Sequence, residues 1–120
     1  MLDAISTNVR VFVAEDNPIL RRGMKLLLQE VSDIDVLADA AVEWAMGKEV
    51  EVLRPDVVIL STLTGAPDKP FSVFEITRVL VETVPSTAVV IITANDREEY
   101  LNQALKAGAS GFVLARAEVE

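Results

Sequence analysis

The chain has 120 residues, among them 11 Lys or Arg, 19 Asp or Glu, no His and no Cys, and its formal net charge is −8. The missing His and Cys exclude histidine-based catalytic triads, thiolate nucleophiles, disulfides and zinc sites made of those ligands. The acidic balance has the wrong sign for a surface that binds nucleic acid or an anionic membrane. Since 51% of the residues are hydrophobic, we expect one compact domain over residues 1–120 with an aliphatic core.

The N-terminal segment, residues 1–8, has neither the basic nor the apolar stretch of an export signal. No apolar run approaches the roughly 20 residues that a membrane-spanning helix needs. We therefore expect a cytoplasmic protein without a membrane partner.

Short aliphatic runs predict buried strands. They are rich in β-branched residues and nearly continuous rather than alternating, which is typical of strands covered on both faces of a parallel sheet. The runs are residues 9–14, 56–60 and 88–92, with weaker candidates at 34–38 and 111–114.

Stretches with a period near 3.6 residues lie between these runs and predict helices. Asn17 and Pro18 begin the first helix, as its cap and first-turn residue. One face of that helix carries Leu20, Met24, Leu27 and Leu28. Further helices are expected over residues 43–54, 71–83 and 96–106, ended by Pro55, Pro85 and Gly108. The alternation predicts βα units with right-handed crossovers, hence an α/β fold with a doubly wound sheet.

The last predicted strand is followed only by residues 115–120. A fifth helix is expected after it, and residues 116–120 would be its first turn, with the rest in a longer natural protein or supplied by another subunit. Where that helix is truncated or absent, an aliphatic strip of one sheet face is left uncovered. Such strips favour self-association, so we expect a homodimer.

Ligands of doubly wound sheets bind beyond the carboxyl ends of the strands. Glu15 and Asp16 follow the first strand, and two adjacent carboxylates there can bind Mg²⁺. From spacing alone, the favoured interpretation is an acidic loop in which Asp16 or Asn17 caps the next helix. The sequence contains no glycine-rich phosphate loop, and these acids would repel a nucleotide phosphate. The same edge is expected to hold residues 61–63, 93–94 and 115–116.

Four stretches resemble the receiver domain of response regulators, in the NarL/FixJ type. They are residues 9–17 (VRVFVAEDN), 54–60 (RPDVVIL), 89–93 (VVIIT) and 104–114 (ALKAGASGFVL). With matching spacing between them, the resemblance extends over nearly the whole chain. The resemblance implies a flavodoxin-like (βα)5 fold with strand order 2-1-3-4-5. It also implies phosphorylation of an Asp after the third strand, Mg²⁺ held by an acidic pair, a Thr or Ser after the fourth strand and a Lys after the fifth.

Four residues match the functional positions of that family. Glu15 and Asp16 fall on the acidic pair, with Asp16 as the direct metal ligand. Thr93 falls on the switch hydroxyl, and Phe112 on the aromatic residue of the fifth strand that accompanies it. For Thr93 the alternative is an ordinary strand-end hydroxyl bonded to nearby backbone.

Other positions depart from the family. Ser61 stands in place of the phosphoacceptor, and Ala115, followed by Arg116, in place of the Lys. The segment 61–71 is longer than the usual loop and has Gly65 where a Pro is expected. Its Pro67 and Pro70 suit a lid or docking loop as well as a disordered one.

These departures predict a degenerate pocket that binds Mg²⁺ weakly or not at all and is not phosphorylated. Phosphotransfer needs a carboxylate that attacks phosphorus and binds the metal, together with a cation that neutralises developing charge. Ser61 offers an uncharged hydroxyl, and we expect no base beside it. Asp56 lies near the opposite edge of the sheet, and Asp68 would reach the pocket only if its loop folded back.

Two other features have a plain interpretation. Trp44 is expected to be partly buried against the sheet, early in the second helix, rather than to serve as a ligand platform. Residues 96–100 suit a solvated helix start with acids at the positive end of the dipole, or a part of the fourth-helix face with which receivers bind partners.

Together these observations predict an atypical receiver domain that regulates through protein contacts without phosphorylation, has no cofactor and is not an enzyme. It would be the N-terminal part of a transcription regulator whose DNA-binding domain lies outside this chain. Two alternatives stay open. The first is a receiver switched by an unconventional phosphoacceptor or a bound ligand, and the second is a Mg²⁺-dependent hydrolase, which Ser61 disfavours.

Overall fold

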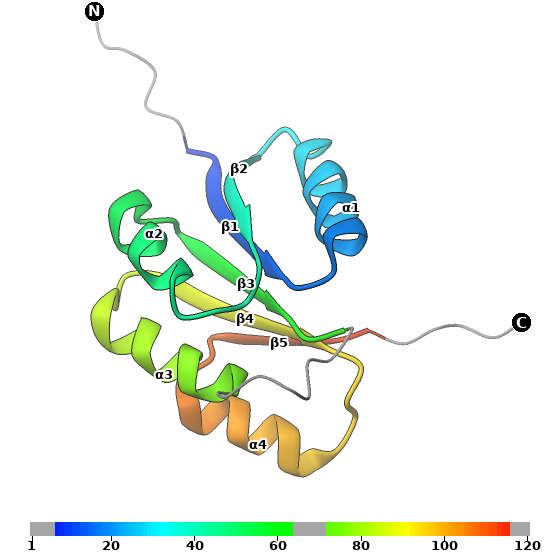
Figure 1. Cartoon of the computed structure of the whole chain (residues 1–120), viewed down its shortest axis with the longest axis vertical. Coiled ribbons are helices and arrows are strands. Elements are labelled where there is room, and N and C mark those ends of the chain that lie inside the picture. Colours follow the sequence, from blue (N-terminus) through cyan, green and yellow to red (C-terminus); the bar gives the residue numbers. More distant parts are fainter. Residues whose placement is uncertain (1–6, 64–71, 116–120) are drawn as a thin grey trace, which may run out of the picture.

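The computed structural model describes residues 7–63 and 72–115. Strands and helices alternate along these residues (Figure 1). The strands are β1 (Val9–Glu15), β2 (Ile34–Ala40), β3 (Val57–Ser61), β4 (Ala88–Thr93) and β5 (Gly111–Leu114). The helices are α1 (Pro18–Gln29), α2 (Met46–Leu53), α3 (Val73–Thr83) and α4 (Glu98–Ala107).

The strands form one parallel sheet in the order β2-β1-β3-β4-β5. The predicted doubly wound α/β fold is therefore confirmed. The three continuous aliphatic runs form the central strands β1, β3 and β4, and the two weaker candidates form the edge strands β2 and β5. Central strands of a parallel sheet are covered on both faces, so they need apolar residues throughout. All carboxyl ends meet at one edge, where Glu15 pairs with Ser61 and Ser61 with Ile92.

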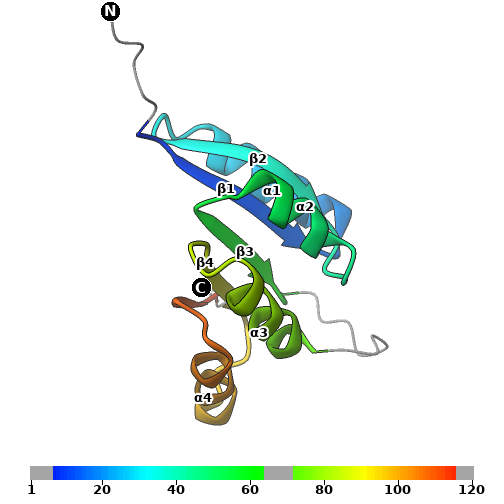
Figure 2. The same ribbon diagram turned by 90° about the vertical axis from the view of Figure 1, so that its left-hand side faces the viewer.

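One face of the sheet carries the main core. It packs against α2, α3 and α4, which lie on the same side in Figures 1 and 2. Small aliphatic side chains dominate, in keeping with the few aromatic residues of the chain. Its members include Phe12, Val58, Leu60, Val89 and Ile91 from the sheet and Met46, Val50, Ile76, Leu80 and Ala104 from the helices.

The opposite face is covered differently, because α1 packs on β1 and β2. On this face the side chains of β3 and β4 (Val57, Ile59, Val90 and Ile92) are half-buried, and Val113 of β5 is exposed. No residue of α1 is buried. Leu27, which the sequence pattern places on the apolar face of α1, is 68% exposed. The reason is that no described element lies beside α1 to cover that part of its apolar side.

The second helix begins later than its sequence pattern predicts. Its first residue is Met46, and Trp44 lies in the preceding turn with 46% of its surface exposed. The prediction that Trp44 lies in this helix is therefore wrong. Met46 and Val50, one helical turn apart, already fill the space between helix and sheet.

Hydrogen bonds from Arg10 hold the C-terminal end of α2. Arg54 ends the helix in the left-handed conformation, with φ of 50°. The guanidinium of Arg10 donates to the carbonyl oxygens of Leu53 and Arg54, at 2.6 and 2.5 Å. Asp56 accepts from the backbone N–H of Arg10 at 2.8 Å, so it lies at the end of the sheet away from Ser61, as predicted.

Residues 1–6, 64–71 and 116–120 lie outside the described residues. The expectations for Gly65, Pro67, Asp68, Pro70, Arg116 and a further helix therefore fall outside them too. Within the two described ranges, no helix has the length and apolar composition needed to cross a membrane.

Candidate functional site

The carboxyl edge of the sheet brings Glu15 and Ser61 into direct contact. Glu15 ends β1 and Ser61 ends β3, and they are neighbours in the strand register. Ser61 Oγ donates a hydrogen bond of 2.5 Å to Glu15 Oε1. Glu15 is 0% exposed and Ser61 3%. A bond this short to a carboxylate is of the strong, charge-assisted kind.

This contact corrects one expectation. The sequence predicts no base beside Ser61, whereas the structure places the Glu15 carboxylate there. The residues are 46 positions apart in the chain, and only the pairing of β1 with β3 joins them. The carboxylate is nevertheless fully engaged, because Glu15 Oε2 accepts from the backbone N–H of Asn17 at 2.8 Å. These hydrogen bonds offset the cost of burying an acidic side chain.

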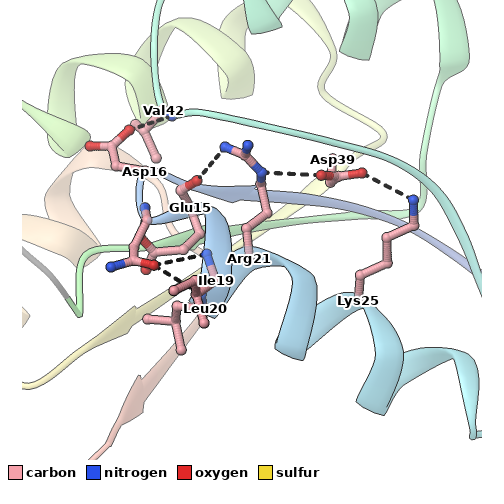
Figure 3. Close-up of polar contacts among 9 residues, drawn as sticks. Glu15, Asp16, Ile19, Leu20, Arg21, Lys25, Asp39 and Val42 are labelled. Carbon is pink, nitrogen blue, oxygen red and sulfur yellow. Dashed lines mark hydrogen bonds and ion pairs between the residues drawn. The ribbon is translucent and has the colours of Figure 1, made fainter.

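Asp16 is also bonded within the protein. Its Oδ1 accepts from the backbone N–H of Val42 at 2.9 Å, which ties the loop after β1 to the loop after β2 (Figure 3). The helix cap is Asn17, whose Oδ1 accepts from the N–H groups of Ile19 and Leu20. Of the two residues that could cap α1, Asn17 does so.

A group of three charged residues, missed in the sequence, lies beside the acidic pair. Arg21 Nη1 donates to the backbone oxygen of Glu15 at 2.9 Å, and its Nε lies 3.1 Å from Asp39 Oδ2 (Figure 3). Lys25 Nζ is 3.2 Å from the other oxygen of Asp39. Arg21 and Lys25 are one turn apart on α1, a spacing that signals a shared partner, although the sequence did not reveal that β2 supplies it.

Thr93 ends β4 and Ala115 directly follows β5, at the same edge of the sheet. Thr93 is 2% exposed, and its Oγ1 accepts from the backbone N–H of Asn95 at 3.1 Å. It therefore makes the local backbone bond that was the alternative to a switch role. Ala115 donates its backbone N–H to the carbonyl of Thr93 at 2.8 Å, and its methyl side chain supplies no charge.

Phe112 packs near Tyr100, which the sequence analysis places in a solvated helix start or on a partner-binding face. Its ring centroid lies 6.1 Å from that of Tyr100 on α4, and Tyr100 stands 4.8 Å from Phe74 on α3. The phenol oxygen of Tyr100 is 3.2 Å from Oγ1 of Thr62. The four-residue spacing of Tyr100 and the buried Ala104 is the signal that could have placed Tyr100 on the inner side of its helix.

The donors at this edge do not fit a magnesium site of the kind that the resemblance implies. Mg²⁺ demands near-octahedral oxygen ligands and is usually held by free carboxylates and waters. Both oxygens of Glu15 and one of Asp16 already accept hydrogen bonds, and Ser61 adds no charge. Across residues 7–63 and 72–115, no three or more acidic, His or Cys side chains are grouped to hold a metal ion.

Comparison with known families gives a match to most of the chain. Residues 11–118 match the family of the response regulator receiver domain. The oxygen regulatory protein NreC of Staphylococcus epidermidis is 35% identical over 106 residues, which are 88% of this chain and 47% of that protein. NreC of Staphylococcus haemolyticus is 32% identical over 112 residues, 93% of this chain and 50% of that one. The chain thus spans about half the length of these relatives.

Solved structures agree with this match. The signal receiver domain of NarL from Mycobacterium tuberculosis is similar with a TM-score of 0.78 and 27% identity, over 92% of this chain and 86% of that one. A DNA-binding response regulator of the LuxR family from Staphylococcus aureus has a TM-score of 0.75 and 25% identity, over 88% and 85%. The chain therefore belongs to the response regulator receiver domain family, in its NarL/LuxR type.

Proposed function

We propose that this receiver domain is atypical, and that it regulates by contact with other proteins rather than by accepting a phosphoryl group. The observation that carries the proposal is the buried hydrogen bond from Ser61 to Glu15. Where the resemblance implies a free carboxylate that attacks phosphorus, the chain has a hydroxyl that donates its proton inward. Glu15, Asp16 and Ser61 are bonded to groups of the protein itself.

The chemistry of Ser61 supports this proposal. Glu15 is positioned to accept the serine proton, but both of its oxygens already accept hydrogen bonds within the protein. Both groups are buried, so a phosphoryl donor cannot approach Oγ unless the pocket opens. Ala115 supplies no cation to neutralise the charge that develops during transfer. We accordingly propose weak or no Mg²⁺ binding, no cofactor and no enzymatic turnover.

Incubation with acetyl phosphate and Mg²⁺, followed by intact-mass measurement, tests the proposal. We expect no mass gain for the wild-type chain. A stable gain of one phosphoryl group that Ser61→Ala abolishes would contradict it and favour an unconventional phosphoacceptor. Turnover of generic phosphoesters would favour the hydrolase alternative.

A gain-of-function variant provides the positive control. The double substitution Ser61→Asp with Ala115→Lys restores the two missing charged groups. Ser61→Asp alone would press a second carboxylate against Glu15, so we expect its stability to rise with added Mg²⁺ while that of the wild type does not. If the double variant neither binds Mg²⁺ nor is phosphorylated, the pocket differs from the family in shape as well as in side chains.

The partners in a full-length protein form the second part of the proposal. Since the relatives are about twice as long as this chain, we propose that it is the regulatory part of a transcription regulator. DNA binding would belong to a domain outside residues 1–120, because a net charge of −8 disfavours a phosphate backbone.

We also propose that two copies of this chain associate through the face that α1 only partly covers. Ile19, Leu26 and Leu27 are exposed on α1, and the side chains that β3 and β4 place on the same face of the sheet are half-buried. Apolar side chains left open to solvent on one face favour association. Light scattering at micromolar concentration should give the mass of a dimer, and Leu27→Lys should give that of a monomer. Val52→Lys, at an exposed apolar position of α2, is the matched control, and a monomeric wild type would contradict the proposal.

A further inference from the structure

A groove lies between α3 and α4, which pack side by side (Figures 1 and 2). Its volume is about 430 Å³. None of the residues that line it is a site residue of the carboxyl edge, so the groove is a second surface of the domain. Among the described residues, its lining comes from α3 with its cap and from α4: Ser72, Phe74, Glu75 and Arg78 from the first, and Gln103 and Lys106 from the second.

The charge of the groove differs from that of the rest of the chain. Two cations, Arg78 and Lys106, and one anion, Glu75, line it, whereas the whole chain has a net charge of −8. Across residues 7–63 and 72–115, neither Arg78 nor Lys106 forms an ion pair, although Glu75 stands about one turn before Arg78 on the same helix. The two positive charges are therefore open to a negatively charged group from outside the chain.

The main apolar side chain of the groove is Phe74. It is half-buried, and Tyr100 of α4 packs edge-on against it, with 4.8 Å between the ring centroids. This aromatic contact holds the ring of Phe74 between the two helices. The charged and amide-bearing side chains of the lining are all exposed. The groove therefore combines a fixed apolar ring with a rim on which positive charge predominates.

This arrangement suits a segment of a protein better than a small molecule. Small-molecule sites are concave and bury most of the ligand surface, whereas four of the six lining residues are exposed. A groove along two helices instead accepts a chain segment that packs an apolar side chain inside and keeps its charges at the rim. Charge complementarity selects an acidic segment, because its carboxylates would meet Arg78 and Lys106.

We propose that the groove between α3 and α4 binds a short acidic segment of a partner protein. One aliphatic side chain of the segment packs on Phe74, and its carboxylates pair with Arg78 and Lys106. This inference rests on the proposed function, since it names the kind of partner through which a receiver regulated by contact would act. The two can nevertheless fail separately. Phosphorylation of Ser61 would contradict the proposed function and leave the groove intact, whereas a groove that binds no acidic segment would leave the acetyl phosphate result unchanged.

Amide NMR of the whole chain, titrated with the capped peptide Glu-Glu-Leu-Glu-Glu, tests the proposal. We expect the signals of residues 72–78 and 103–106 to shift along one saturation curve. The capped peptide Gln-Gln-Leu-Gln-Gln has nearly the same size but no charge, and it should bind about four- to twentyfold more weakly. Added salt should weaken binding of the acidic peptide, because exposed ion pairs are screened. Equal binding of the two peptides would overturn the proposal.

Substitutions assign the binding to the two cations. Arg78→Gln and Lys106→Gln should each weaken it about two- to fivefold, the range for exposed ion pairs. Arg78→Glu with Lys106→Glu should abolish binding of the acidic peptide and confer binding of Lys-Lys-Leu-Lys-Lys. The matched control is Arg22→Glu with Lys48→Glu, which changes the net charge equally at exposed cations of α1 and α2 and should leave binding within about twofold.

Three results would overturn the proposal. The first is an absence of shifts at residues 72–78 and 103–106 when the acidic peptide is added. The second is a control pair that weakens binding as much as the reversal of Arg78 and Lys106. The third is a shift of the same signals when the concentration of the chain alone is raised, which would identify a second copy as the occupant of the groove.

Discussion

Replacing Ser61 with Ala should destabilise the domain strongly for so small a change. The substitution deletes one oxygen and removes the hydrogen bond from Ser61 to the Glu15 carboxylate, which is 0% exposed, while the bond from the backbone N–H of Asn17 remains. Hydrogen bonds to charged groups contribute about 1.5–3 kcal/mol, and a buried acceptor left without its donor costs a similar amount. Because water cannot reach Glu15 to replace the lost donor, we expect the free energy of unfolding to fall by about 2–3 kcal/mol.

Equilibrium unfolding in urea measures this loss, with the midpoint falling and the slope unchanged if the denatured state is unaffected. Ser110→Ala, at an exposed serine in the loop before β5, is the control and should stay within about 0.5 kcal/mol of the wild type. The Ser61→Ala effect should nearly vanish in a Glu15→Ala background, since the partner is then gone. A Ser61→Ala change no larger than that of Ser110→Ala would refute the contact on which the proposed function rests.

Three smaller perturbations examine the frame around the pocket. Arg10→Met keeps the apolar stem but removes both bonds to the end of α2. Thermal or urea unfolding should show that the free energy of unfolding falls by about 1–2 kcal/mol. No change would mean that water replaces the guanidinium. Asn17→Ala removes the cap of α1 and should cost about 1 kcal/mol by the same measurement, with Asn17→Ser close to neutral. Leu80→Ala, at a buried position of α3, should cost about 2–5 kcal/mol, whereas Leu27→Ala, which is largely exposed, should cost under 1 kcal/mol; equal costs would contradict the assignment of the core.

The order and type of the elements could be predicted because their signals are local. Aliphatic runs and helical periods depend on neighbouring residues, and so does the cap at Asn17, whose bonds reach only two and three residues ahead. Element boundaries were less well predicted. The start of α2 at Met46 rather than near residue 43 depends on which side chains fill the space above the sheet, and this decides the exposure of Trp44.

Sequence alone determined that this chain is an alternating α/β domain and that Glu15, Asp16, Ser61 and Thr93 gather at one edge of its sheet, since parallel strands present their carboxyl ends together. Tertiary structure alone decided how these groups are used. The serine hydroxyl finds Glu15 because β1 and β3 pair in a register that makes them neighbours, and Tyr100 finds Thr62 only where α4 packs beside the sheet. Such contacts join residues 46 and 38 positions apart, so their distances follow from strand register and helix packing, which no local pattern encodes.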